Sequence, residues 1–281
     1  MLLGVVALGG CSDEGSVKTS DSSGTPAAPN DGWGERAGTR DGAPTITAPD
    51  GPAPQDLVTT DVTIGEGAEL QSGQLAVVDY IGANYSNGVV FDASYGRAPF
   101  SVKIGEGKVI KGWDQGLVGM RVGGRRQLVI PPDLAYGDQS QGDIGPNETL
   151  IFLVDLRAAL SRPKPQPAPD PVTELKITDV TEGSGDRAVE SGDTVNVQYV
   201  GVLGGSGEEF DASWDRGEPF SFEVGAGRVI AGWDQGLIGM KLGGRRRLVI
   251  PGDLAYGATG SPPQIGPNEQ LVFEIDLVGF G

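Results

Sequence analysis

The sequence contains no histidine and a single cysteine, Cys11, among its 281 residues. Without an imidazole there is no Ser-His-Asp or Cys-His nucleophile system and no histidine metal ligand. One cysteine excludes an intramolecular disulfide and a thiolate zinc site. Basic residues are also scarce, 21 against 38 acidic ones, so the formal net charge is −17. A chain this acidic lacks the clustered basic face that nucleic acid requires, and we expect no nucleic-acid partner.

Glycine and proline are abundant instead, with 47 and 20 residues. Such a composition is typical either of extended, unpacked segments or of folded domains with many tight turns. The chain length suits about two domains of ordinary size. The distribution of glycine and proline indicates that both cases occur here, in different segments.

The first eleven residues, 1–11, have the pattern of a signal peptide. The apolar run Leu2–Leu8 is too short to span a bilayer as a mature helix and suits the hydrophobic core of such a peptide. Small residues then precede Cys11, an arrangement that resembles the lipobox of bacterial lipoproteins, in which the cysteine carries the lipid. We therefore expect an extracytoplasmic protein, lipid-anchored at Cys11 to the bacterial cell membrane. The alternative is an ordinary thiol near the terminus.

Two segments that are poor in large apolar residues divide the rest of the chain. Residues 12–56 cannot bury enough surface to offset the entropy of ordering, so we expect a disordered tether. Residues 161–171 carry proline at nearly every other position, which favours an extended polyproline II linker. Two segments of ordinary domain size remain, 57–160 and 172–281.

These two segments are repeats of one another. Phe91-Asp-Ala-Ser recurs from Phe210, and the run Val-Ile-X-Gly-Trp-Asp-Gln-Gly-Leu begins both at Val109 and at Val229. A third run, Pro-X-Asp-Leu-Ala-Tyr-Gly, follows in each copy. The sequence therefore predicts two domains of the same fold.

Within each copy the periodicity predicts mainly strands. Segments such as 75–81 and 194–200 are rich in β-branched and aromatic residues with partial alternation. The exception is 109–118, where Ile110, Trp113 and Leu117 fall on one face of a short helix. We predict an α+β fold class with two domains, each an antiparallel β-sheet wrapped around one short α-helix. The adjacent arginines at 125–126 and 245–247 are expected on a solvated strand face.

Five motifs occur in the same order in both copies: Val-X-Tyr-X-Gly, Phe-Asp-Ala-Ser, Gly-X-Gly-X-Val-Ile-X-Gly-Trp-Asp-X-Gly-Leu, Pro-X-X-Leu-Ala-Tyr-Gly and Ile-Gly-Pro-Asn-Glu. Together they resemble the FKBP family of peptidyl-prolyl isomerases. The resemblance covers essentially all of 57–160 and 172–281, and it implies an FKBP-like domain in each.

The resemblance also implies a pocket, lined by aromatic side chains, that receives the substrate proline. The tryptophans would form its floor, and the hydroxyl of Tyr136 or Tyr256 would donate a hydrogen bond to a substrate carbonyl, as would the backbone N–H of Ile110 or Ile230. The residues implied to be catalytic are Asp92, Tyr136, Trp113, Asp211, Tyr256 and Trp233. Those implied to bind substrate are Tyr80, Phe91, Phe100, Val109, Ile110, Ile144, Phe152, Tyr199, Phe210, Phe220, Val229, Ile230, Ile265 and Phe273.

This chemistry needs neither histidine, nor a metal, nor a cofactor. Rotation about an X-Pro bond breaks no bond and moves no proton, because the barrier of about 18–20 kcal/mol comes from amide resonance. The twisted amide is less polar than the planar one, so a dry aromatic pocket favours it. We expect Asp92 and Asp211 to be ionised and hydrogen-bonded, and not to act as general acids.

We therefore predict a monomeric peptidyl-prolyl isomerase that assists the folding of exported, proline-containing polypeptides. The resemblance further implies binding of rapamycin-type macrolides. The flap after Ala-Tyr-Gly differs between the copies, with Ser261 where many relatives have histidine and Gln141 in a shorter first flap, so we expect unequal specificity. Two alternatives remain: a lipid-anchored, proline-binding chaperone module with one domain weakly catalytic or inactive, and an envelope scaffold that uses the fold for spacing.

Overall fold

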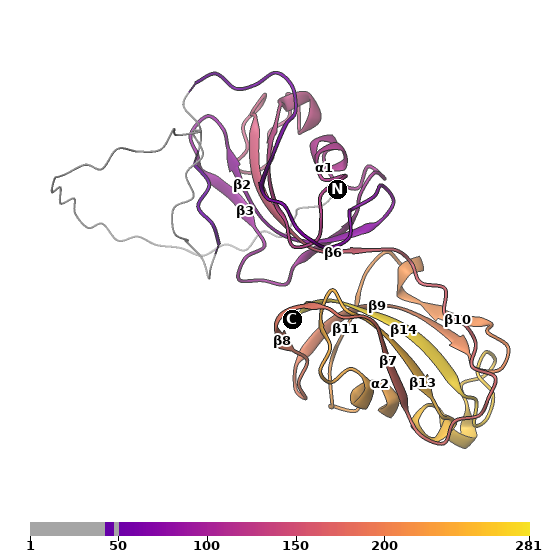
Figure 1. The fold of residues 1–281 in the computed structure, drawn as a ribbon. Helices are drawn as coiled ribbons and strands as arrows, with labels where there is room; N and C mark the ends of the chain where they lie inside the picture. Colours follow the sequence, from indigo (N-terminus) through magenta and orange to yellow (C-terminus); the bar gives the residue numbers. More distant parts are fainter. Residues whose placement is uncertain (1–42, 48–50) are drawn as a thin grey trace, which may run out of the picture.

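The structure, a computed structural model, describes residues 43–47 and 51–281. The first repeat forms one antiparallel sheet in the order β1-β5-β6-β2-β3, and β4 also pairs with β2 (Figure 1). One short helix, α1 (Lys111–Gly116), and a 3-10 turn at Pro132–Leu134 complete this domain. Its strands are β1 (Val58–Thr63), β2 (Leu75–Asn84), β3 (Val90–Ala93), β4 (Phe100–Lys103), β5 (Arg125–Ile130) and β6 (Leu150–Leu160).

The second repeat has the same topology, with sheet order β10-β9-β14-β13-β7 and β11 paired to β9. It adds a small two-stranded sheet of β12 and β8, and its helix is α2 (Ala231–Gly236). Its 3-10 turns lie at Ser213–Asp215, Gly252–Leu254 and Gly257–Thr259. Its strands are β7 (Lys176–Thr181), β8 (Ser184–Ala188), β9 (Thr194–Leu203), β10 (Glu209–Ala212), β11 (Phe220–Glu223), β12 (Lys241–Leu242), β13 (Arg245–Ile250) and β14 (Leu271–Phe280).

Each helix lies very close to its sheet because it presents glycine there. A Cβ placed on Gly112 would lie 2.3 Å from the Ile130 side chain, and one on Gly116 would lie 2.7 Å from Leu128. The predicted α+β class is therefore confirmed. The helix is shorter than the 109–118 pattern suggests, because Ile110 is extended (φ −58°, ψ 146°) and Gly119, at φ 80°, redirects the chain.

The adjacent arginines are not a solvated face, so that expectation was wrong. Arg246 is only 7% exposed. Its Nη1 donates to the carbonyls of Gly236 and Ile238, at 2.9 and 2.7 Å, and its Nε pairs with Asp179. Arg126 bonds the end of α1 in the same way. The last carbonyls of a helix need donors, and a strand arginine supplies them here.

The proline-rich linker lies against the second domain and does not stand free of it. The Ala168 N–H donates to the Gly204 carbonyl at 2.9 Å, and the Gln270 side chain bonds both Ala168 O and Val172 N, at 2.6 and 2.7 Å. Arg247 donates to Gln166 O at 2.5 Å. The expected spacer is therefore a packed segment.

An apolar cluster joins the two domains near the start of this linker. It includes Leu75, Val77 and Leu160 of the first domain and Val278 of the second. The backbone carbonyl of Ser161 accepts a hydrogen bond of 2.5 Å from Arg245, which ties the end of β6 to β13. Figure 1 shows the two sheets meeting where β6 leaves the first domain.

A short part of the expected tether also packs on the first domain. Ala43 is 1% exposed, and Ile46 contacts the buried side chains of Ile81, Ala93 and Leu153. The prediction of disorder throughout 12–56 was therefore too broad, because this short segment contains the apolar residue that fits the sheet. Cys11 lies outside the described residues.

Candidate active site

The first domain gathers aromatic side chains from five elements above the helix. Trp113 of α1 is 3% exposed and meets the rings of Tyr80 and Phe152 edge-on, at centroid distances of 5.2 and 5.3 Å. Phe100 lies 6.0 Å from Trp113, and Phe91 lies 5.5 Å from Phe152. Edge-to-face packing at these distances is favourable and holds each ring in one orientation. The result is a rigid aromatic floor and wall.

These rings enclose a cavity of about 420 Å³. Gly107, Lys108, Lys111 and Ala135 also contribute to its lining. The predicted residues that line it are Tyr80, Phe91, Asp92, Phe100, Val109, Ile110, Trp113, Tyr136 and Phe152. Ile144 is not among the lining residues, because it packs in the core at 5% exposure.

A three-residue polar group closes one side of this cavity. The Tyr80 hydroxyl donates a short hydrogen bond to Asp92 Oδ2, while Asp92 Oδ1 pairs with Arg97 Nη2 at 2.7 Å. Burial, and then the hydrogen bond to Asp92, raise the pKa of Tyr80 well above its usual range. The Tyr80 hydroxyl therefore stays protonated and continues to donate its hydrogen bond to Asp92.

Three polar hydrogens at the pocket have no protein partner. The Tyr136 hydroxyl, the Ile110 N–H and the buried indole N–H of Trp113 donate no hydrogen bond to any residue that the structure describes. Buried or half-buried donors are normally satisfied, so such groups point to a bound molecule or water. Burial raises the pKa of Tyr136, with a further contribution from Asp92, which preserves it as a donor.

The loop before the helix is held by the aspartate of the Gly-Trp-Asp motif. Asp114 accepts hydrogen bonds from the N–H groups of Gly105 and Gly107, at 2.7 and 2.9 Å. Both glycines have positive φ, 87° and 67°, a region that other residues rarely adopt. This arrangement sets Ile110 in its extended conformation at the pocket, so the motif aspartate positions the site without lining it.

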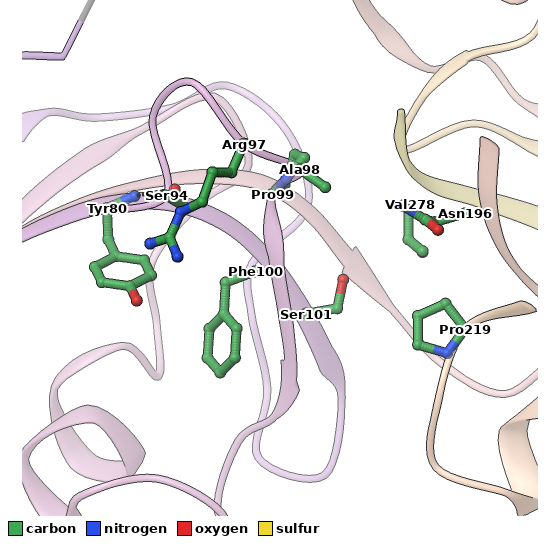
Figure 2. A pocket seen from close by; sticks show the side chains of 10 residues that line it. All are labelled: Tyr80, Ser94, Arg97, Ala98, Pro99, Phe100, Ser101, Asn196, Pro219 and Val278. Carbon is green, nitrogen blue, oxygen red and sulfur yellow. Dashed lines mark hydrogen bonds between the residues drawn. The ribbon is translucent and has the colours of Figure 1, made fainter. Parts of the chain in front are cut away.

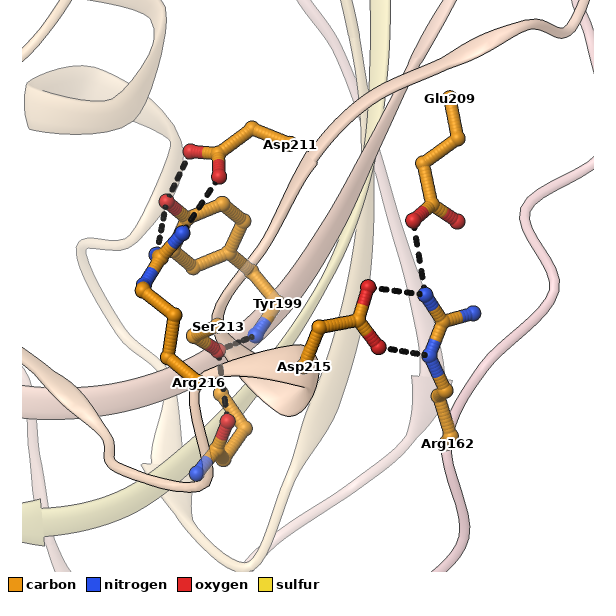
Figure 3. A network of polar contacts seen from close by, with 8 residues as sticks. Arg162, Tyr199, Glu209, Asp211, Ser213, Asp215 and Arg216 are labelled. Carbon is orange, nitrogen blue, oxygen red and sulfur yellow. Dashed lines mark hydrogen bonds and ion pairs between the residues drawn. The ribbon is translucent and has the colours of Figure 1, made fainter.

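The second domain repeats the polar group with one more bond. Tyr199 donates to Asp211, Arg216 Nη1 pairs with Asp211 Oδ1 at 2.5 Å, and Arg216 Nη2 donates to the Tyr199 hydroxyl at 2.8 Å (Figure 3). Burial and the hydrogen bond to Asp211 raise the pKa of Tyr199 to about 12. The Asp211 side chain is 42% exposed, against 16% for Asp92, so the second site is more open.

The other predicted residues of the second domain are gathered in the same way. Trp233 meets Tyr199 at 5.0 Å, Phe273 at 5.2 Å and Phe220 at 6.2 Å. Phe210 packs on Phe273 at 5.5 Å. Val229 and Ile230 pack half-buried against the core, Ile265 is buried in it, and Tyr256 is 42% exposed.

Comparisons with known proteins identify the family of the chain. The family model "FKBP-type peptidyl-prolyl cis-trans isomerase" matches residues 67–157 and 185–278, which is more than half of the chain. The chain belongs to this family. A "FK506-binding protein" of Streptomyces anulatus is 55% identical over 113 residues, covering 40% of this chain and 90% of its own.

Longer FKBP relatives share the tandem arrangement over part of their length. "Peptidyl-prolyl cis-trans isomerase FKBP10" of Bos taurus is 36% identical over 207 residues, 72% of this chain, and the chain spans only 34% of that protein. The crystal structure of AtFKBP13 is 41% identical, with a TM-score of 0.35 over 38% of this chain and 96% of its own. The family model matches each repeat separately, so the chain contains two FKBP-type peptidyl-prolyl cis-trans isomerase domains.

Sequence reasoning missed the arginine of each polar group. Arg97 and Arg216 each stand five residues after the motif aspartate, at matched positions of the two FKBP domains. Their recurrence at the same distance from the aspartate is the sequence signal that could have identified them. In the described part of the chain, no group of His, Cys, Asp and Glu is arranged to hold a metal, and no helix there has the length and apolarity to cross a membrane.

Proposed function

We propose that each FKBP domain isomerises X-Pro bonds through its aromatic pocket, and that the clients are exported polypeptides. The main support for this proposal is the first cavity. Its surface is formed by the rings of Trp113, Tyr80 and Phe152, and beside them the Tyr136 hydroxyl and the Ile110 N–H have no protein acceptor. A proline ring fits against the indole, and the donors meet the flanking carbonyls. The twisted amide gains more from this surface than the planar one does, which lowers the barrier.

In this mechanism each aspartate holds a tyrosine ring in place and takes no part in proton transfer. Asp92 is held by the Tyr80 hydroxyl and by Arg97, and Asp211 is held in the same way by Tyr199 and Arg216. Each carboxylate fixes its tyrosine ring in the pocket wall. Proton transfer is not required, since rotation about the amide leaves every bond in place.

The test is isomerase activity of the full chain on a proline tetrapeptide, with each pocket disabled in turn. We define the second-pocket background as Asp211→Val/Tyr256→Phe and the first-pocket background as Asp92→Val/Tyr136→Phe. Each background should retain activity from the other domain, and the combination of both should fall to the uncatalysed rate. Full activity in the combined variant would contradict the pocket assignment.

The more open second site favours one alternative, in which that domain mainly binds proline segments as a chaperone. Phe220 and Tyr256 there are 36% and 42% exposed. A more open pocket excludes water less completely, so its rate enhancement should be smaller. The first-pocket background would then bind a proline peptide with little activity.

Macrolide binding and location are part of the same proposal. The name of the Streptomyces relative supports a macrolide, of FK506 or rapamycin type, as a ligand of the first pocket, and such a ligand should compete with the peptide. The Leu2–Leu8 run and Cys11 support a signal peptide and a lipid anchor outside the cytoplasm. Palmitate labelling that is lost in Cys11→Ser, together with a labelled precursor that accumulates under globomycin, would support the anchor, and labelling unchanged in Cys11→Ser would oppose it. We expect a monomer, which sedimentation would test.

A further inference from the structure

A second cavity, of about 460 Å³, lies between the two domains, next to the first pocket. Tyr80 and Phe100 line both cavities. Figure 2 shows the rings of Tyr80 and Phe100 on the first-domain side and Pro219 of the second domain on the opposite side. We call this cavity the interdomain cleft; it is lined by Tyr80, Ser94, Arg97, Ala98, Pro99, Phe100, Ser101, Asn196, Pro219 and Val278.

The cleft is formed where the loop between β3 and β4 meets the end of β14. A Cβ placed on Gly279 would lie 3.5 Å from Pro99 Cδ and 3.3 Å from Asn196 Nδ2. The absence of a side chain at Gly279 thus lets the loop approach the second domain directly. Val278, beside it, is 1% exposed and belongs to the apolar cluster that joins the domains. The cleft is therefore walled by residues that the interdomain contact holds in place.

Its polar groups are suited to a polypeptide main chain. Asn196 is half-buried, and within the described part of the chain its amide has no hydrogen-bond partner. An amide side chain donates and accepts, which matches the alternating C=O and N–H of an extended peptide. Ser101 adds a hydroxyl, while Pro99 and Pro219 add apolar surface.

The polar wall is specific to the second domain. The position in the first repeat that matches Asn196 is Val77, which is fully buried in the interdomain cluster. The two copies therefore differ at the very position that faces the cleft. A buried valine serves packing, whereas the half-buried asparagine leaves an amide free to bond a ligand.

We propose that Ser101, Asn196 and Pro219 form a subsite that binds the residues flanking the proline held in the first pocket. The proposal rests on the proposed function, since it takes the first pocket as the place where proline binds. A polypeptide with its proline against Trp113 can leave the pocket past Tyr80 or Phe100, and these two residues also line the interdomain cleft. The second domain thereby contributes to the substrate preference of the first.

The test compares two substrates in the second-pocket background, so that only the first pocket acts. One is a proline tetrapeptide, and the other carries the same four residues extended by about three at each end, roughly 10 Å of chain. Asn196→Ala and Ser101→Ala should each lower the ratio of kcat/KM for the long peptide to that for the tetrapeptide by about two- to tenfold, mainly through KM. Ser221→Ala, at the matched position on β11, is the control and should leave this ratio unchanged.

An equal ratio in all variants would overturn the subsite. A separate NMR titration keeps the test independent of catalysis. The Asn196 side-chain amide signals should shift with the long peptide and much less with the tetrapeptide. If the pocket signals of Trp113 shift but those of Asn196 do not, the subsite is wrong while proline binding stands. If neither shifts and no activity is found, the proposed function itself fails.

Discussion

The Tyr80 hydroxyl donates its hydrogen to Asp92, and Arg97 holds the other carboxylate oxygen of Asp92 at 2.7 Å. The tyrosine comes from β2 and the aspartate from β3, so this bond fixes the ring that β2 contributes to the pocket. Tyr199 and Asp211 repeat the relationship in the second domain. An aspartate that orients a ring, and does not transfer a proton, agrees with a reaction in which only a torsion angle changes.

The first prediction concerns the coupling of this pair. In the second-pocket background, Asp92→Val and Tyr80→Phe should each lower kcat/KM by about five- to tenfold, the loss of roughly one hydrogen bond to a charged group. The double variant should be little worse than either single one, because both remove the same bond. Strictly additive losses would show that the two residues act separately. Circular dichroism would confirm that each variant is folded.

The second prediction contrasts two buried tryptophans, Trp113 of the Gly-Trp-Asp run and Trp214 directly after the second Phe-Asp-Ala-Ser run. In the second-pocket background, Trp113→Leu removes the pocket floor and its edge contacts with Tyr80 and Phe152, so we expect a loss of about 1–3 kcal/mol in stability and at least about a tenfold loss in kcat/KM. Trp214 lies in the apolar cluster that joins the two domains, so Trp214→Leu should lower stability without lowering kcat/KM. Urea denaturation and the tetrapeptide assay measure the two effects. Equal activity losses in both variants would make the floor assignment untenable.

The sequence was sufficient to predict the fold and most of the pocket. Ordered motifs in two copies carry the aromatic residues, since Tyr80, Phe91 and Trp113 each belong to a recognisable run. Arg97 was missed because a single arginine after a glycine has the pattern of an exposed turn. Its role depends on a side chain reaching back to Asp92, which strand periodicity does not encode.

Contacts between distant segments were the other part that the sequence did not predict. The alternating prolines of the linker predict an extended backbone but not its partner, so nothing in the linker indicates that Gln270, about a hundred residues later, bonds its backbone. The interdomain cleft depends in the same way on how Gly279 meets Pro99. Such contacts follow from the docking of finished domains, whereas the pocket follows from residues within one repeat.

The third prediction is the absence of a pH dependence in catalysis. The tyrosine hydroxyls at both sites act as donors in their protonated form. Burial, assisted by Asp211, raises the pKa of Tyr199 to about 12, so this donor is present below that pH and is lost only as the pH rises through it. The kcat/KM for the tetrapeptide should therefore stay constant, within about twofold, from about pH 6 to about pH 9. A bell-shaped profile centred near neutrality would instead require a titrating group in the mechanism.

The fourth prediction concerns a buried Asp–Arg ion pair that occurs in both domains. The residue beside its carboxylate differs between them. Asp155 is bonded by Arg125 Nε at 2.6 Å and by the Tyr95 hydroxyl at 2.7 Å. Burial alone would raise the pKa of Asp155, but these bonds hold it below its usual value. In the second domain Trp214 replaces the tyrosine, and burial raises the pKa of Asp276 to about 6 despite the bond from Arg245.

Tyr95→Phe should therefore raise the pKa of Asp155 towards that of Asp276 in the second domain. Because the folded pKa of Asp155 is depressed, its contribution is present above the unfolded value and is lost as the pH falls through the folded one. Removing the Tyr95 donor should cost about 1.5–3 kcal/mol near neutral pH, and because it raises the folded pKa of Asp155 towards the unfolded value, this difference from the wild type should shrink as the pH falls through the acid range. Urea denaturation at a series of pH values measures both effects. Tyr85→Phe, whose exposed hydroxyl lies 3.3 Å from Pro52 O, is the control, and an identical midpoint in the two variants would exclude this role for Tyr95.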